Sequence, residues 1–335
     1  MIRSRIVRRL ALVLCAVTMG VCAVLLAPGA AQAARRTTPS LASASEQAER
    51  PFGVTMPGTP GGSQLASLAS ALGRTPDEVM WYVAWSTQTG FPTTDAARVR
   101  DLGATPVITW EPWDPSAGLG QTTYSMKSIA AGTWNGYLKS WARGAAKYGS
   151  PVVIRFAHEM NGTWYPWAIG VDGTTSADYV GAWNRMRTVF KNAGATNVTF
   201  RWNPNVPYPG STPMAQAWPG ASKVDSVALD GYNWGGTLDG TTWTSFADVF
   251  ENGLDEMATL TSLPVIAGET ASVEAGGDDG AAKAQWITAM FATLADDPRF
   301  GGFTWFDYDK ENDWRIDSYQ STFDAFRTGL TSYVS

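Results

Sequence analysis

The sequence predicts an α/β protein of the (β/α)8 TIM barrel class, with a single domain after an N-terminal signal peptide. Three observations lead to this prediction. Apolar runs of strand length alternate with amphipathic segments of helix length eight times along the chain. The strand-like runs are mainly apolar without a strict alternation, as in parallel sheets that are covered on both faces. Residues 51–335 leave about 36 residues for each unit, near the usual size of a strand–helix repeat.

The predicted strands are short runs that are rich in β-branched and aromatic residues. They cover residues 52–56, 79–85, 106–110, 152–156, 198–202, 226–232, 264–268 and 302–306. The predicted helices have apolar residues at spacings of three and four, and several begin near Ser, Thr or Asp and end at Gly. They cover residues 63–73, 93–103, 134–149, 176–194, 245–260, 280–297 and 321–330. Only the fifth strand lacks a long helix after it, and residues 214–220 are expected to be short or irregular there.

An open, doubly wound sheet is the alternative to a barrel. Such a sheet usually carries a glycine-rich phosphate loop between its first strand and helix. The nearest match, Gly118-Leu119-Gly120, lacks the third glycine and does not open a helix after a strand. The barrel is therefore preferred.

Residues 1–33 are predicted to be a signal peptide, residues 34–50 a disordered lead-in and residues 51–335 the catalytic barrel domain. Arginines precede an apolar run at 10–26, and Ala31-Gln32-Ala33 fits a cleavage site. A membrane anchor is the alternative, but the apolar run is short for a span. Arg8-Arg9 leaves open whether export uses the Sec or the twin-arginine route. We therefore expect a secreted, extracellular protein without membrane attachment after cleavage.

The composition of the remaining chain excludes several classes of function. Both cysteines, Cys15 and Cys22, lie in the predicted signal, so no disulfide or thiol chemistry is expected afterwards. The signal also contains four of the 25 basic residues and no acidic one, which leaves a formal net charge of −9. An acidic protein is a poor candidate for binding nucleic acid or anionic membranes. A neutral polysaccharide is the expected partner, and a monomer is the expected state.

Acidic, amide and aromatic side chains gather where the predicted strands end. In a (β/α)8 barrel these strand ends form one face, which carries the active site. The expected residues of this face are Trp110, Glu111, Trp113, His158, Glu159, Asn161, Trp202, Asn203, Tyr232, Asn233, Trp234, Glu269, Trp305 and Asp307.

Two of these residues, Glu159 and Glu269, form a candidate catalytic pair. They are 110 residues apart, which is about three strand–helix units, so they are expected to face each other across the barrel mouth. Two carboxyl groups that flank a glycosidic bond can cleave it with retention or with inversion of configuration, depending on their separation. We expect the shorter separation, of about 5–5.5 Å, that retention requires.

The surroundings of the two glutamates suggest different roles. Glu159 is followed by apolar residues, which favour a raised pKa and the role of acid/base. Glu269 must stay ionised to act as a nucleophile, so it needs donors. Tyr232 on the neighbouring strand is expected to supply one, and Arg155 or Arg201 is expected to supply positive potential.

No metal or other cofactor is expected. His158, the only histidine, is expected to orient Glu159 or touch a sugar hydroxyl, because the H-E-x-x-H pattern of zinc enzymes is absent. The acidic run at 307–313 lacks the central glycine of a calcium loop. It is interpreted as a solvated or substrate-facing loop.

Tryptophans near the strand ends are expected to line sugar subsites. The chain has sixteen tryptophans, and Trp113, Trp164, Trp167 and Trp234 fall in loops at the predicted active face. Indole rings offer a flat apolar surface that matches the C–H face of a sugar ring. Those in predicted helices, such as Trp141, are interpreted as core residues.

The segments RFAHEMNGTWYPW, GYNWG and AGETAS resemble glycoside hydrolase family 26, a family of endo-β-mannanases, over about residues 52–330. The resemblance implies a barrel that works by double displacement with retention. Glu159 would be the acid/base, with His158 as its neighbour, and Glu269 would be the nucleophile. The run WFDYDKENDWRID is similar to the end region of that family.

One departure from the family bears on the substrate. Family mannanases carry a further histidine after an earlier strand, where this chain reads ITWEPWDP with Glu111. β-1,4-Mannan and mixed-linkage β-1,3-1,4-glucan are therefore ranked nearly level. Alternatives are β-1,3-xylan, a bacterial exopolysaccharide, and a non-catalytic carbohydrate-binding protein on a barrel scaffold. A degenerate binding protein is expected to have lost one of the two glutamates, and both are present.

Overall fold

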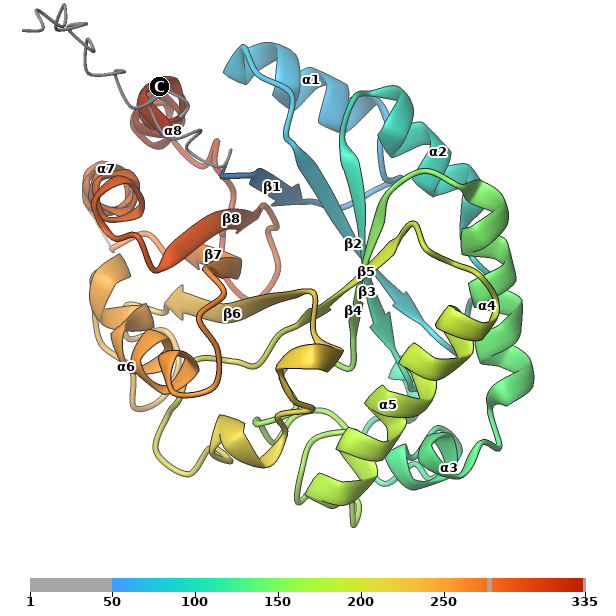
Figure 1. The fold of residues 1–335 in the computed structure, drawn as a ribbon. Helices are drawn as coiled ribbons and strands as arrows, with labels where there is room; N and C mark the ends of the chain where they lie inside the picture. Colours follow the sequence, from blue (N-terminus) through green and yellow to red (C-terminus); the bar gives the residue numbers. More distant parts are fainter. Residues whose placement is uncertain (1–49, 276–278, 334–335) are drawn as a thin grey trace, which may run out of the picture. The chain divides into compact units, whose positions relative to one another are not determined.

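The computed structural model describes residues 50–275 and 279–333. The predicted signal peptide and residues 34–49 of the lead-in lie outside the described residues. Eight parallel strands, β1 to β8, close into a barrel in sequence order, and helices surround them (Figure 1). This arrangement confirms the predicted (β/α)8 class.

The strands follow the predicted apolar runs closely. They are β1 (Phe52–Thr55), β2 (Glu78–Ala84), β3 (Thr105–Glu111), β4 (Val152–Phe156), β5 (Val198–Trp202), β6 (Ser226–Asn233), β7 (Val265–Ser272) and β8 (Phe300–Phe306). Both β4 and β5 have the predicted bounds. The largest difference is in β7, which continues four residues beyond its predicted end, so Glu269 lies within the strand rather than after it.

Eight α-helices are present in the described part of the chain. They are α1 (Ser63–Leu72), α2 (Thr93–Asp101), α3 (Met126–Ala131), α4 (Asn135–Tyr148), α5 (Ser176–Asn192), α6 (Phe246–Ala258), α7 (Ala281–Asp296) and α8 (Gln320–Tyr333). As predicted, β5 is followed by no long helix, but by two short 3-10 turns at Met214–Gln216 and Ala221–Lys223. The short helix α3 was not predicted.

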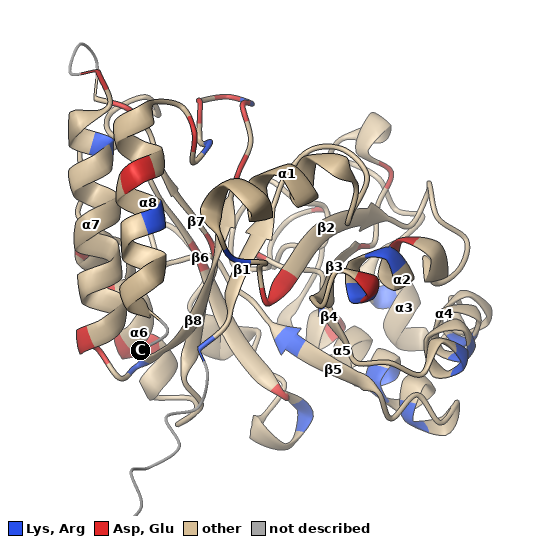
Figure 2. Cartoon of the chain, turned by 90° about the horizontal axis from the view of Figure 1, so that it is seen from above, with Lys and Arg blue, Asp and Glu red and all other residues tan. Residues whose placement is uncertain are grey.

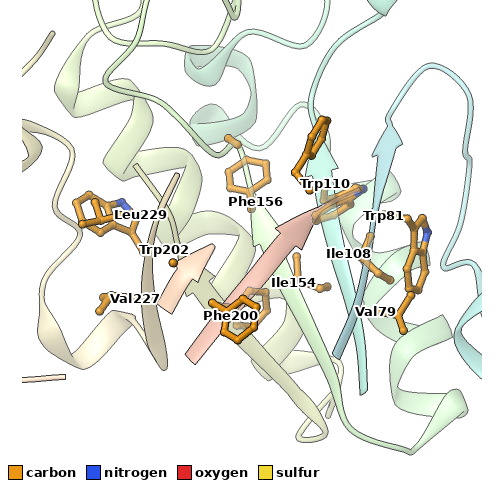
Figure 3. Packing of buried hydrophobic residues seen from close by; sticks show 14 of the residues in the cluster. Val79, Trp81, Ile108, Trp110, Ile154, Phe156, Phe200, Trp202, Val227 and Leu229 are labelled. Carbon is orange, nitrogen blue, oxygen red and sulfur yellow. The ribbon is translucent and has the colours of Figure 1, made fainter. Parts of the chain in front are cut away.

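The main hydrophobic core lies between the strands and the helices. Successive side chains of a strand point to opposite faces, so every second residue faces the helices. In β4 these residues are Ile154 and Phe156, and in β3 they are Ile108 and Trp110, all fully buried (Figure 3). Burial of this apolar layer stabilises the barrel by roughly 25 cal/mol for each Å² removed from water.

The residues between these outward ones fill the inside of the barrel. Met80, Val107 and Val153 form a small apolar cluster there. A buried ion pair lies toward the beginnings of the strands, where Arg201 of β5 donates two hydrogen bonds of 2.8 and 2.7 Å to Glu78 of β2. A second group of buried charges lies toward the strand ends and forms the candidate site.

Candidate active site

Arg155 of β4 connects two carboxylates from neighbouring strands. Its guanidinium group is fully buried and donates hydrogen bonds to Oδ1 of Asp230, at 3.2 Å, and to Oε1 of Glu269. A buried cation is tolerated when carboxylates compensate its charge and hydrogen-bond to it. Of the two arginines considered from the sequence, Arg155 therefore provides the positive charge beside Glu269. Arg201 does not, because it is bound to Glu78.

Glu269 receives a second donor on its other oxygen. The Tyr232 hydroxyl donates a hydrogen bond of 2.5 Å to Oε2, which confirms the predicted contact. Glu269 is only 5% exposed, so water has little access to its carboxylate. Donors on both oxygens stabilise the ionised form of a carboxyl group.

An irregularity in β7 directs Glu269 into the barrel. Leu229 of β6 pairs with Ala267, but the next β6 residue, Asp230, pairs with Glu269, so Gly268 is an extra residue. A bulge of this kind re-aims the side chains that follow it. A Cβ at Gly268 would lie 2.3 Å from Oδ1 of Asn203 and 2.9 Å from Oδ1 of Asp230. Glycine is therefore the residue that fits this position.

Glu159 is placed by an unusual backbone conformation after β4. Ala157 and Glu159 both have positive φ, at 47° and 51°, which is uncommon for residues other than glycine. The conformation is held in part by the Glu159 N–H, which donates a hydrogen bond of 2.8 Å to the Asn203 carbonyl. Strained backbone of this kind gathers at functional sites, where it fixes side-chain direction.

The electrostatic surroundings of Glu159 differ from those of Glu269. Burial, followed by the charge of Glu269, raises the pKa of Glu159 to about 8. Only one of its oxygens, Oε2, accepts a hydrogen bond from a described residue, at 2.6 Å from Nε1 of Trp164. A pKa in this range favours the protonated form of Glu159 near neutral pH.

His158 lies beside Glu159 as a neutral side chain. Burial, and then the charge of Arg155, lower the pKa of His158 well below its ordinary value. Its Nε2 lies 4.0 Å from Oε2 of Glu159, and its ring packs against Tyr165 at a centroid distance of 4.9 Å. His158 is 1% exposed, and its Nδ1 has no hydrogen-bond partner among the described residues.

The only set of residues in the described chain with the spacing of a metal site is His158, Glu159 and Asp230. Their possible ligand atoms lie within 4.8 Å of one another. Arg155 hydrogen-bonds to Asp230 in this set, and its positive charge opposes a bound cation. The charge arrangement therefore favours proton chemistry over a metal centre.

A third acid, Glu111 at the end of β3, lies within electrostatic range of Glu159. Burial raises the pKa of Glu111 to about 7. Its Oε2 accepts a hydrogen bond of 3.3 Å from Nε1 of Trp113. Trp113 packs edge-on against Tyr165, at a centroid distance of 5.3 Å, so both predicted residues belong to the site.

Three site residues were not identified from the sequence. Asp230 lies two positions before Tyr232 on β6, and the same inward alternation could have revealed it. Tyr82 faces the interior from β2, with its ring 6.1 Å from His158. Tyr165 packs on His158 from the loop after β4. These tyrosines occur in aromatic runs, which gave no signal to separate them from core residues.

Three tryptophans predicted to bind substrate are instead buried. Trp110 contacts Trp141 of α4, at 4.4 Å, and Trp305 contacts Phe326 of α8, at 5.2 Å. Strand alternation points both toward the helices, so the prediction for them is wrong (Figure 3 for Trp110). Trp167 is 1% exposed and donates a hydrogen bond of 2.7 Å to the His158 carbonyl, so it holds the backbone of His158 in place.

Two predicted amide residues have structural contacts. Asn161 is buried, and its side chain forms two hydrogen bonds, of 2.8 and 2.9 Å, with the backbone of Asn205. Its amide holds the loop at Asn205, and substrate binding by Asn161 stays a prediction. Asn203 is also buried, and its Oδ1 lies close to Gly268 with no hydrogen-bond partner in the described residues.

The remaining predicted residues lie at the strand ends with differing exposure. Asp307 follows β8, and its Oδ1 accepts a hydrogen bond of 2.7 Å from the Ile316 N–H. Trp234 is half-buried and packs edge-on against Trp314, at 5.0 Å. Trp164 is 41% exposed, which makes it the most accessible of the predicted aromatic residues.

Comparison with known proteins identifies the family of this chain. Residues 79–269 match the family described as glycosyl hydrolase family 26, and this range contains Glu159 and Glu269. The chain belongs to glycosyl hydrolase family 26. The resemblance seen in the sequence is thereby confirmed.

A curated relative from this comparison is endoglucanase H of Acetivibrio thermocellus, which is 34% identical over 276 residues. The match covers 81% of this chain but only 29% of the relative, which is a much longer protein.

Solved structures with the same fold include a family 26 β-mannanase from Bacteroides ovatus, with 17% identity and a TM-score of 0.60. That match covers 86% of this chain and 90% of the other. A modular endo-β-1,4-mannanase from Cellulomonas fimi has 16% identity and a TM-score of 0.62, over 84% of this chain and 70% of the other. At these identities the likeness establishes the fold alone.

Across residues 50–275 and 279–333, no helix is both long enough and apolar enough to span a membrane.

Proposed function

We propose that this family member is a retaining endo-β-glycanase, with Glu159 as acid/base and Glu269 as nucleophile. The asymmetry of the two glutamates carries the proposal. Glu269 accepts hydrogen bonds on both oxygens, from Arg155 and Tyr232. Burial and the charge of Glu269 raise the pKa of Glu159 to about 8, which favours its protonated form at neutral pH. A retaining hydrolase needs one carboxylate and one carboxylic acid at the start of its cycle.

In the first step, the Glu269 carboxylate attacks the anomeric carbon of the sugar. The C–O bond to the leaving sugar breaks, and Glu159 transfers its proton to the departing oxygen. The result is an ester between the sugar and Glu269, together with an ionised Glu159. Arg155 and Tyr232 hold Glu269 in one orientation, so little motion is needed for attack.

In the second step, Glu159 acts as a base. Its carboxylate removes a proton from water, the water oxygen bonds to the anomeric carbon, and the ester bond to Glu269 breaks. The charge of Glu269, which contributes to the raised pKa of Glu159, is absent from the ester. The pKa of Glu159 therefore falls when the intermediate forms, as the change from acid to base requires. Two displacements at one carbon restore its configuration.

We favour a mixed-linkage β-glucan as substrate, with β-1,4-mannan as the second candidate. The 34% identical relative has the name endoglucanase H, which favours a glucan. Family mannanases carry a histidine where this chain has Glu111, and this difference also favours a glucan over a mannan. Trp164, Trp113 and Trp234 are proposed to line the sugar subsites. Trp164 and Trp113 hydrogen-bond to Glu159 and Glu111, and Trp234 packs against Tyr232.

We also propose that residues 1–33 direct export and that the exported protein acts extracellularly as a monomer. An extracellular location suits a polymer substrate that cannot enter the cell. Detection of the mature N-terminus near Ala34 in the culture medium would support this part of the proposal, whereas full-length protein retained in the cell would oppose it.

The proposal is tested by measuring new reducing ends on glucomannan, galactomannan, barley-type β-glucan and β-1,3-xylan, with Glu269→Ala as the control. The wild type is expected to cleave the β-glucan and give products with β-anomers first, seen by NMR. Initial α-anomers would exclude retention, and an active Glu269→Ala variant would exclude the nucleophile. If no polymer is cleaved but one binds, the protein is a carbohydrate-binding protein instead.

A further inference from the structure

A buried lysine outside the acidic site fixes the loop that follows β8. Lys283 of α7 is fully buried, and its Nζ donates to the carbonyls of Asp313 and Arg315, at 2.9 and 2.8 Å, and to Oγ of Ser318, at 3.0 Å. An ammonium group has three N–H donors, so all three are used. Burying a charge costs free energy unless it is compensated in this way. In Figure 2, a loop with several charged residues stands beside the upper end of α8, which lies next to α7.

The segment held by Lys283, residues 313–318, is also tied to the barrel at Trp314. The Trp314 N–H donates to the Tyr308 carbonyl at 2.8 Å, and the Trp314 carbonyl accepts from Nε1 of Trp305 at 2.9 Å. The Trp314 side chain is fully buried. The position of its ring is thus set by the backbone of this segment.

The Trp314 ring packs directly against the tyrosine that binds Glu269. The centroids of Trp314 and Tyr232 are 5.1 Å apart, with the rings inclined at 51°. On another side, Phe306 packs edge-on against Tyr232 at 5.7 Å. Tyr232 is therefore held between aromatic rings, and its hydroxyl donates to Oε2 of Glu269.

We propose that Lys283 is a positioning residue for the hydrolytic reaction, acting through Trp314 and Tyr232 on Glu269. The inference rests on the proposed function, in which Glu269 is the nucleophile. Lys283 fixes the backbone of residues 313–318, this backbone fixes the Trp314 ring, and the ring limits the motion of Tyr232. Without the lysine, two carbonyls and one hydroxyl lose their donor, and the segment must move to find other partners.

The test is a double-mutant cycle between Lys283→Met and Tyr232→Phe in the full chain, measured as kcat and KM on the cleaved polysaccharide. A misplaced catalytic group lowers the rate by up to about 100-fold. Lys283→Met is expected to lower kcat about 10- to 100-fold and to change KM less than about threefold. In the Tyr232→Phe background, the same change is expected to have less than about a twofold effect, because no hydroxyl remains to be positioned.

Arg185→Met is the matched control. Arg185 of α5 also donates to a backbone carbonyl, that of Ala130, at 3.2 Å, but on the outer helices. Its variant is expected to keep kcat. Lys283→Arg, which keeps the charge and the donors, is expected to recover part of the lost kcat.

Three outcomes would overturn the inference. These are an unchanged kcat in Lys283→Met, equal losses from this change in both backgrounds, and an unchanged kcat in Tyr232→Phe. If Lys283→Met does not fold, as seen by circular dichroism, Ser318→Ala takes its place in the cycle, because it removes one of the three contacts. An active Glu269→Ala variant would instead show that the proposed function fails, so the two failures are distinguishable.

Discussion

Trp164 Nε1 donates a hydrogen bond of 2.6 Å to Oε2 of Glu159, while 41% of Trp164 remains exposed. One side chain thus contacts the acid and offers a surface to a sugar. The bond opposes the rise that burial and Glu269 cause in the pKa of Glu159. Trp164 therefore influences the protonation of Glu159, and its exposed indole face is consistent with the proposed sugar subsite.

Replacing Trp164 by phenylalanine is expected to move the alkaline limb of the kcat/KM profile to higher pH. In the wild type, activity is expected to fall as pH rises through about 8, because the proposed acid Glu159 then loses its proton. Without the indole donor, the ionised form of Glu159 is less stable, so the pKa of Glu159 rises further. A hydrogen bond worth ~1 kcal/mol gives a shift of roughly half to one pH unit. Trp243→Phe, at an equally exposed tryptophan in the loop after β6, should leave the limb in place.

Replacing Glu111 by glutamine is expected to move the same limb in the opposite direction. Burial is the largest cause of the raised pKa of Glu159, Glu269 is the second, and Glu111 adds a smaller contribution. The pKa of Glu111 is about 7, so its charge acts mainly above that pH. Glu111→Gln should therefore move the alkaline limb to lower pH. Below pH 6, kcat/KM should change less than about threefold. A shift to higher pH would contradict this account, and the exposed Glu251→Gln serves as the control.

Replacing Arg155 by methionine is expected to abolish catalysis and destabilise the fold. Removing one partner of a buried ion pair costs about 3–5 kcal/mol, because the other charge stays buried without compensation. Here Asp230 and Glu269 would remain as unpaired acids. Urea unfolding gives the free energy of unfolding, and hydrolysis assays give kcat.

Arg201→Met provides the matched control for that change. Arg201 is a buried arginine paired with Glu78 toward the other end of the barrel. A similar loss of stability is expected, with kcat of the folded fraction within about threefold of the wild type. Equal losses of kcat in both variants would mean that the effect of Arg155 is only structural.

Replacing Gly268 by alanine is expected to lower kcat by about 100-fold. The added Cβ would lie 2.3 Å from Asn203 Oδ1 and 2.9 Å from Asp230 Oδ1, so β7 or its neighbours must shift. Such overpacking also costs typically 1–3 kcal/mol of stability. Gly136→Ala in α4 meets no atom within 4 Å and should leave both quantities nearly unchanged. Wild-type activity in Gly268→Ala would contradict the role given to the bulge.

The sequence was sufficient to predict the barrel architecture, because each strand and helix is marked by a local pattern of residues. A mainly apolar, β-branched and aromatic run of five or more residues needs no distant partner to identify it, so β4 and β5 were predicted with their observed bounds. Eight such runs with helices between them define the order of the barrel. They also predict which residues share its functional face, since parallel strands end at the same edge. Glu159 and Glu269 could be paired on this basis.

The direction of individual side chains required the tertiary structure. Trp110 and Glu111 are neighbours in sequence, but one faces the helices and the other faces the site. Strand alternation separates them only when one residue of the strand is already known to face inward. At β7 even this rule fails, because the extra residue Gly268 changes the alternation and brings Glu269 inward.

The ion-pair partners of the two inward-facing arginines could be identified only from the closed barrel. Arg155 and Arg201 occupy equivalent positions in the aligned strands β4 and β5. Arg201 pairs in register with Ser226, the first residue of β6, whereas the partner of Arg155 is Asp230, four residues further along the same strand. The sequence determined that both arginines lie in strands. The tilt of the strands decided which one reaches Glu269, because equivalent positions in a tilted barrel lie at different heights along its axis.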